Sequence, residues 1–270
     1  MKFKFALLIF LSIYITTTLT NCKKDDGTNI IQLNLFSIED DKKMGLQVSE
    51  EIAADPRQFP ILDEIQFSVA YSHLRRITSE VLDKAAMKHR NDFVWQTKII
   101  INDSVLNAFC TPGGYIYVYT GLIKYLESED QLAGVLGHEI AHADERHTTE
   151  AMTTALGRDL LVKMILGDSS LAGQVTTSLL GLKYSRGSET EADLRSVEYL
   201  DKTDLDARGV GRFFEKLLTS GQSGGPQFLS THPSPDNRVQ AITNKWIELG
   251  SKVGETFPAR YLEFKNSLPK

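Results

Sequence analysis

The chain has 270 residues, of which 41% are hydrophobic and 24% are charged. These proportions are typical of a globular protein with room for one domain and a sizeable core. The formal net charge is −5, and no long basic segment is present. We therefore expect no nucleic-acid partner, because proteins that bind nucleic acids carry a basic surface.

The N-terminal segment predicts export. Lys2 and Lys4 precede an apolar stretch over residues 5–19. This stretch is shorter than the roughly 20 residues that a helix needs to span a bilayer. The pattern is typical of a secretory signal peptide, which we place at residues 1–21.

The residues Leu19-Thr20-Asn21-Cys22 resemble a bacterial lipobox, in which the cysteine becomes the acylated first residue of the mature protein. We therefore expect a lipid anchor on Cys22 and a place in the bacterial cell envelope, at the outer membrane. Asn21 departs from the small residue usual in this motif, so an ordinary signal peptide is the alternative. Residues 22–35 are interpreted as a tether. A Cys22–Cys110 disulfide is the interpretation that competes with lipidation.

Two helices are predicted in the next part of the chain. Ser37 is suited to cap a helix that ends near Ala54, ahead of two prolines. A second helix is expected over residues 63–88, where apolar residues recur with a period of about 3.6.

Three short strands follow at residues 93–101, 105–109 and 115–119, which are rich in β-branched and aromatic residues. The last of them alternates as a strand with one half-exposed face would. We therefore predict an α+β fold that is mostly helical and carries a small three-stranded sheet.

The rest of the chain predicts helices. Ser128 and Gln131 fit a capping box at the start of a helix that reaches about His147. Ser234, followed by proline, is suited to start the last helix. The other helices are expected at residues 148–166, 170–182, 188–202 and 210–218. The first two of these suit either the core or a flap over a cleft. The predicted domain covers residues 36–265.

A metal-binding motif lies in the helix that begins near Ser128. In His138-Glu139-Ile140-Ala141-His142, the two histidines are four residues apart, so they share one helix face with Cβ atoms about 5–6 Å apart. Two imidazoles at this spacing can bind one Zn²⁺, and Glu139 is placed to act as a base on water. The alternative is a surface helix with two solvated histidines.

A third ligand is expected from Glu189-Thr190-Glu191-Ala192-Asp193. Glu189 and Asp193 share a helix face, whereas Glu191 points to roughly the opposite side. One carboxylate of such a pair can bind the metal while the other accepts the N–H of a ligating histidine.

Four separated motifs together resemble the HtpX and CAAX-prenyl-protease (Oma-like) type of gluzincin metallopeptidase over about residues 35–250. They are His138-Glu139-Ile140-Ala141-His142 with Arg146-His147, Ser185-Arg186 leading into Glu189-Thr190-Glu191-Ala192-Asp193, Asn107-Ala108-Phe109 with Pro112-Gly113-Gly114, and Ser230-Thr231-His232-Pro233 with Arg238. The resemblance implies a zincin-type metallopeptidase domain with one Zn²⁺ per chain. It makes His138, His142 and Glu189 the ligands, Glu139 the catalytic base, and Asp193 the partner that orients a ligand.

The resemblance also places His232 and Arg238 near the metal. Both are candidates for stabilising the negative charge that develops during peptide hydrolysis. His232 has a second interpretation as a fourth metal ligand that silences the resting enzyme until a loop moves. His147 is expected to cap or pack near the helix end rather than to bind the metal.

A substrate-binding role is predicted for Gly114, Tyr115, Ile116 and Tyr117. An exposed edge strand beside the zinc helix could pair with an extended peptide through main-chain hydrogen bonds. The alternative is a buried central strand.

The expected function is that of a zinc-dependent endopeptidase acting on unfolded or misassembled proteins of the bacterial envelope. No apolar run after the signal peptide approaches 18 residues, so the chain resembles a small soluble lipoprotein branch of the family. One alternative is a chaperone-like binding lipoprotein with a structural or silenced zinc site. Another is a zinc hydrolase of a different substrate class, such as an aminopeptidase or amidase. The sequence does not indicate an oligomeric state.

Overall fold

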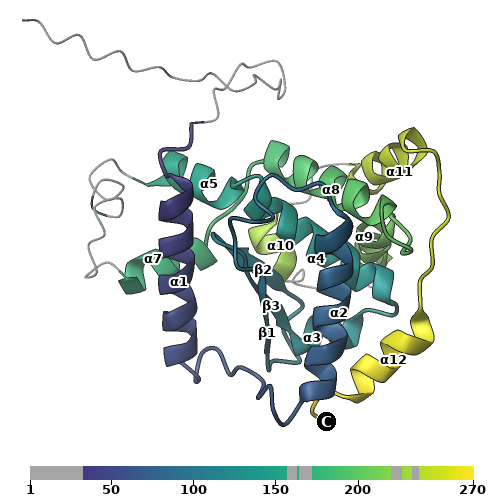
Figure 1. The fold of residues 1–270 in the computed structure, drawn as a ribbon, viewed down its shortest axis with the longest axis horizontal. Coiled ribbons are helices and arrows are strands. Elements are labelled where there is room, and N and C mark those ends of the chain that lie inside the picture. Colours follow the sequence, from purple (N-terminus) through teal and green to yellow (C-terminus); the bar gives the residue numbers. More distant parts are fainter. Residues whose placement is uncertain (1–32, 157–162, 164–171, 220–226, 233–236) are drawn as a thin grey trace, which may run out of the picture. The chain divides into compact units, whose positions relative to one another are not determined.

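Three short strands with helices on both faces organise the structure, a computed structural model that describes residues 33–156, 163, 172–219, 227–232 and 237–270 (Figure 1). Residues from Leu33 onward form one compact unit. The predicted signal peptide, Cys22, most of the tether and Ser234 lie outside the described residues. The prediction of a mostly helical α+β fold with a small three-stranded sheet is confirmed.

The strands are β1 (Gln96–Ile100), β2 (Ala108–Thr111) and β3 (Tyr115–Tyr119). The helices are α1 (Ile38–Ala54), α2 (Ser68–Lys84), α3 (Thr120–Tyr125), α4 (Glu129–Asp144), α5 (His147–Ala155), α7 (Ala172–Leu180), α8 (Arg186–Asp201), α9 (Gly209–Thr219), α10 (Gln227–Thr231), α11 (Arg238–Glu248) and α12 (Pro258–Asn266). Among the described residues, no helix is long and apolar enough to cross a bilayer.

The sheet has the order β1-β3-β2, so β3 is its central strand. It pairs in parallel with β1, Ile116 opposite Thr97, and antiparallel with β2, Ile116 opposite Cys110. The prediction that Gly114, Tyr115, Ile116 and Tyr117 form a substrate-binding edge strand is therefore wrong. Both sides of β3 already carry main-chain partners, and all five of its residues are buried.

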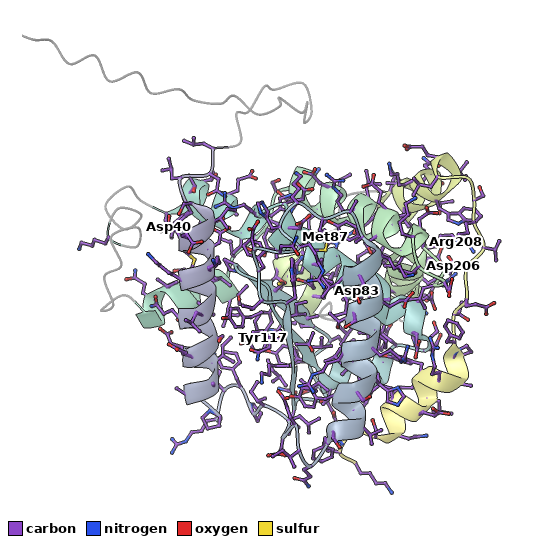
Figure 2. All side chains as sticks on the ribbon, in the orientation of Figure 1. Asp40, Asp83, Met87, Tyr117, Asp206 and Arg208 are labelled. Atoms are coloured by element: carbon purple, nitrogen blue, oxygen red, sulfur yellow. The ribbon has the colours of Figure 1, made fainter. Side chains whose placement is uncertain are left out.

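The two faces of β3 belong to different parts of the core. Ile116 and Val118 pack in the large cluster that also holds the apolar residues of α2 and α4. Tyr115, Tyr117 and Tyr119 lie on the opposite face, in a second cluster with residues of α1 and α7 (Figures 1 and 2). The alternation of the sequence thus separates two apolar environments rather than an apolar one from solvent.

Helix α4 is buried along its whole length. Its neighbours approach closely at two glycines. A Cβ at Gly134 would lie 2.2 Å from the backbone N of Val210 at the start of α9, and one at Gly137 would lie 2.9 Å from Oγ of Ser196 in α8. Gly137 directly precedes His138, so the missing side chain brings α8 up to the metal-binding motif.

The helix ends differ in part from the predictions. Ser37 caps α1 through a capping box with Asp40, as expected for a helix start. Ser128 is the N-cap residue of α4, but its side chain makes no capping bond. The Gln131 side chain accepts from the Glu127 N–H rather than from the Ser128 N–H, so the predicted capping box is not formed. Helix α4 ends at Asp144 rather than at His147, and Arg146 adopts a left-handed conformation with φ 63° before α5 begins.

Candidate metal centre

Two imidazoles of α4 converge with a carboxylate of α8. The Nε2 atoms of His138 and His142 lie 3.1 Å apart. Glu189 places Oε1 3.4 Å from Nε2 of His142 and Oε2 3.7 Å from Nε2 of His138. All three side chains are fully buried. The i, i+4 spacing on one helix and the close approach of α8 at Gly137 bring these residues together.

His232, which directly follows α10, joins the same cluster. Its Nδ1 lies 3.0 Å from Oε1 of Glu189 and 3.4 Å from Nε2 of His138. Its ring stacks on Phe228, with the ring centroids 4.4 Å apart. One donor atom from each of His138, His142, Glu189 and His232 lies within 4.8 Å of the others. Three imidazoles and one carboxylate form a donor set that suits a zinc-type ion.

The charge states of His138, His142 and Glu189 also suit a cation. Burial lowers the pKa of His138 and of His142, which favours the neutral imidazole that binds metals. Burial acts to raise the pKa of Glu189, but hydrogen bonds from His142 and His232 outweigh it and lower the pKa. Glu189 is therefore held as a carboxylate.

Glu139 lies beside the cluster. Both of its carboxylate oxygens are buried, and neither has a hydrogen-bond partner among the described residues. Oε1 lies 3.5 Å from Nε2 of His232. Burial raises the pKa of Glu139 to about 7, so its carboxylate gains affinity for a proton. A buried acid with unpaired oxygens beside a cation site is suited to act on water or substrate.

Asp193 and Arg238 support the cluster from behind. Oδ1 of Asp193 lies 2.9 Å from Nδ1 of His138. Arg238 forms two bonds to Asp193, of 2.5 and 2.7 Å, and its Nη2 lies 3.0 Å from Oε2 of Glu189. The Arg238 guanidinium also stacks over the ring of Phe214. Nε and Nη2 of Arg238 are therefore bonded to carboxylates. These contacts indicate that Arg238 holds Glu189 and Asp193 in position.

His147 was expected only to cap or pack, yet it contacts a site residue. Its Nδ1 lies 3.0 Å from Nδ1 of His142, and its side chain is buried. In a continuous helix, a residue five positions after His142 would point away from this face. The left-handed backbone at Arg146 ends that helix and turns His147 back toward His142.

A cavity of about 260 Å³ opens beside the cluster. Tyr184, whose ring stacks on His142 with centroids 3.9 Å apart, and His232 both line it. Most of the remaining lining is apolar or amide-bearing and comes from the residues before α2, from β2 and its approach, from β3 and from α7: Gln58, Phe59, Asn102, Val105, Asn107, Phe109, Cys110, Tyr119, Leu179, Leu180, Leu182, Gln227 and Thr231. Oδ1 of Asn107 is buried with no hydrogen-bond partner among the described residues.

Comparison with known proteins finds metalloendopeptidases and proteases among the relatives of this chain. The chain is 34% identical over 162 residues to the mitochondrial metalloendopeptidase OMA1 of Arabidopsis thaliana, covering 58% of this chain and 33% of the relative. It is 28% identical over 237 residues to OMA1 of Schizosaccharomyces pombe, covering 85% of this chain and 67% of the relative. It is 30% identical over 179 residues to the beta-barrel assembly-enhancing protease of Escherichia coli, covering 60% of this chain and 37% of the relative.

The chain thus spans about a third of the length of the Arabidopsis and E. coli proteins. The family model of peptidase family M48 matches residues 70–246, which hold both the motif of α4 and the carboxylates of α8. The Oma-like resemblance carried by the four motifs is confirmed by this match and by the OMA1 relatives. The chain therefore belongs to peptidase family M48, a family of metal-dependent peptidases.

Proposed function

We propose that the protein is a zinc-dependent endopeptidase that hydrolyses internal peptide bonds. The observation that carries the proposal is the buried cluster of His138, His142, Glu189 and His232, with the unpaired carboxylate of Glu139 beside it. When bound, zinc supplies Lewis-acid polarisation of the peptide carbonyl and lowers the pKa of water. His138, His142 and Glu189 would hold the ion.

The proton transfers are assigned to Glu139. Its carboxylate accepts a proton from the attacking water and then gives a proton to the leaving amine nitrogen. Burial supports the role of base, because it raises the pKa of Glu139 and so increases the affinity of the carboxylate for a proton. No side-chain hydrogen bond to Glu139 is found among the described residues, which leaves its oxygens available for water.

His232 is proposed as a fourth ligand in the resting state. Its Nδ1 lies 3.0 Å from Glu189 and 3.4 Å from His138, which is close enough to share a metal ion with them. A four-ligand site resembles a structural zinc site, which leaves no position for the nucleophile. Activity then requires His232 to move away, and stabilisation of the reaction intermediate is its second role.

The substrate is proposed to be an extended peptide that pairs with β2. The outer side of β1 is already bonded by residues 60–62, whereas β2 is an edge strand among the described residues. Phe109 and Cys110 of β2 line the cavity beside His232, together with apolar residues of α7. A strand-like peptide on β2 would therefore carry an apolar side chain into the cavity.

Unfolded or misassembled polypeptides of the bacterial envelope are the proposed substrates. They expose extended backbone and apolar side chains together, which is the combination that β2 and the cavity accept. The name of the E. coli relative, a beta-barrel assembly-enhancing protease, supports an envelope context. We infer a lipid anchor on Cys22 from the lipobox resemblance alone.

The lipid anchor is tested by labelling bacteria that express the full chain with a fatty acid. We expect the wild-type protein to incorporate label and to sediment with membranes, and Cys22→Ala to lose both properties. Equal labelling of Cys22→Ala would contradict the anchor and favour an ordinary signal peptide.

The proposed activity is tested by incubating the zinc-loaded full-length chain with casein and with a short N-acetylated peptide. Internal cleavage of both substrates supports an endopeptidase. Cleavage of peptides with free N-termini only would indicate an aminopeptidase. Stoichiometric zinc binding without cleavage by the wild type or by His232→Ala would favour a binding lipoprotein with a structural site.

A further inference from the structure

We propose that His147 is a positioning residue for the metal ligand His142, and that Glu191 acts on His142 through His147. The inference rests on the proposed zinc site and adds a series of three contacting side chains to it. This series runs from His142 in α4 through His147 at the start of α5 to Glu191 in α8.

The contact between the two histidines requires one Nδ1 to donate and the other to accept. Their Nδ1 atoms lie 3.0 Å apart, and both rings are buried. The Nε2 atom of His142 faces the cluster, so in the metal-bound form the proton of His142 resides on Nδ1. This N–H then donates to Nδ1 of His147, which must accept and therefore carries its own proton on Nε2.

Glu191 favours this tautomer of His147. Its Oε2 lies 3.5 Å from Nε2 of His147, on the side of the ring opposite His142. A carboxylate in this position stabilises a proton on Nε2 and so keeps Nδ1 free to accept. The carboxylate therefore influences His142 without touching it.

Helix α8 thus supports the cluster through three acidic residues. Glu189 joins the cluster itself, Asp193 contacts His138 directly, and Glu191 reaches His142 through His147. Glu191 points away from the helix face shared by Glu189 and Asp193. The imidazole of His147 lies between Glu191 and His142. Both histidines of α4 thereby have a partner on the second ring nitrogen, as metal-ligating histidines usually have.

The backbone that places His147 is itself held by α1 and by Phe36 just before it. Arg146, with φ 63°, donates from Nε to Oδ2 of Asp41 at 2.6 Å and from Nη2 to the carbonyl oxygen of Phe36 at 2.5 Å. These bonds hold the turn between α4 and α5 and with it the orientation of the His147 ring. The bonds that orient His147 therefore come from residues outside the cluster.

The test is the dissociation constant of Zn²⁺, measured on the full-length chain by competition with a chromophoric chelator. His147→Phe keeps a ring but removes the acceptor, and we expect it to weaken zinc binding by roughly 10–100-fold. His147→Asn, whose Oδ1 can accept the same N–H, is expected to recover part of that loss. His89→Phe is the matched control, because His89 lies outside the cluster and contacts Asp92.

Glu191→Gln tests the contact between Glu191 and His147. It should weaken zinc binding in the wild-type background and have no further effect in His147→Phe, because residues that act through one another are not additive. The absorption spectrum of the Co²⁺-substituted chain gives a second readout, which a purely structural role would leave unchanged. We expect it to shift in His147→Phe and to return toward wild type in His147→Asn.

Two results would overturn the inference. One is a zinc dissociation constant and a Co²⁺ spectrum in His147→Phe equal to those of the wild type. The other is additivity of His147→Phe and Glu191→Gln. If His147→Phe does not fold, Glu191→Gln decides the question: a zinc dissociation constant and a Co²⁺ spectrum equal to those of the wild type would overturn the inference. A wild-type chain that binds no zinc would instead contradict the proposed function.

Discussion

At the scale of single residues, the two histidines of α4 are held by different groups. Nδ1 of His138 contacts the carboxylate of Asp193, and Arg238 donates two hydrogen bonds to the same carboxylate. Nδ1 of His142 contacts Nδ1 of the His147 ring. A carboxylate accepts a more strongly polarised N–H bond than an imidazole does, so Asp193 is expected to make His138 the better electron donor of the two.

Asp193→Asn is expected to weaken zinc binding by roughly 10–100-fold while the chain stays folded. The amide keeps the shape of the carboxylate but loses its charge, and Arg238 loses an ionic partner at the same time. Chelator competition measures the loss. Asp92→Asn, at a half-exposed carboxylate outside the cluster, is the control and should bind zinc as the wild type does.

His232→Ala is expected to raise the basal rate of casein cleavage, because it opens the fourth position of the cluster. Initial rates at saturating zinc measure the effect. A fall in rate at unchanged zinc affinity would show that His232 stabilises the intermediate rather than restrains the enzyme. His73→Ala, which alters a histidine outside the cluster, should leave the rate unchanged.

The sequence predicted much of this cluster. The i, i+4 histidines and the shared face of Glu189 and Asp193 follow from helical periodicity alone, and the structure brings all four together. His147 was missed because its contact depends on a left-handed residue, Arg146, inside what the sequence presents as a continuous helix. A non-glycine residue at positive φ leaves little trace in the sequence, since bonds from α1 far along the chain hold it there.

At the scale of elements, α4 is the member around which the site is built. Its buried surface packs in the core with residues of α2, α8 and α9, and close contact with α8 and α9 depends on Gly137 and Gly134. At Gly134 a Cβ would lie 2.2 Å from a backbone atom, which cannot rotate away. The spacing between α4 and α9 is therefore set by the absence of a side chain.

Gly134→Ala is expected to lower the free energy of unfolding by about 1–3 kcal/mol, because the overpacked methyl group must displace α9. Gly173→Ala is a matched control within α7, where a Cβ would meet no atom within 4 Å. It should raise stability by roughly 0.5–1 kcal/mol through a lower entropy of the unfolded chain. Urea denaturation compares the two variants, and equal effects would contradict the close packing of α4 against α9.

Leu180→Trp is expected to slow casein cleavage several-fold without changing zinc affinity. Leu180 of α7 lines the cavity of about 260 Å³, and a larger ring there would occupy the space proposed for a substrate side chain. Initial rates of casein cleavage at saturating zinc measure the effect. Ile247→Trp, at an exposed position on α11, is the control.

The position of β3 within the sheet could not be predicted from the sequence pattern. The alternation of residues 115–119 predicted a strand correctly but suggested a half-exposed face. Tyrosine fills that face in the second apolar cluster, against α1 and α7. Because a tyrosine suits both a wet face and a buried one, the pattern could not distinguish an edge strand from a central one.

At the scale of the whole described unit, the cluster links segments far apart in the chain. His138 and His142 come from α4, Glu189 from α8 and His232 from the residue after α10. An ion held by all of them would restrain these segments relative to one another. Metal binding is therefore expected to stabilise the fold as well as to support catalysis.

Zinc is expected to raise the free energy of unfolding by about 4 kcal/mol when its free concentration is a thousand times the dissociation constant. Thermal melts with and without a chelator measure this as an increase in Tm. The double variant His138→Ala/His142→Ala should show no zinc-dependent shift, because it lacks two of the ligating nitrogens. An equal shift in that variant would place the stabilising metal elsewhere in the protein.

The most direct test of the central claim is cleavage of casein by the zinc-loaded full-length chain, compared with Glu139→Gln. We predict that Glu139→Gln binds one zinc per chain as the wild type does but cleaves roughly 10²–10⁴-fold more slowly, because the amide cannot accept the proton from water. Cleavage by Glu139→Gln at the wild-type rate would contradict the assignment of Glu139 and of the α4 cluster as the site of peptide hydrolysis.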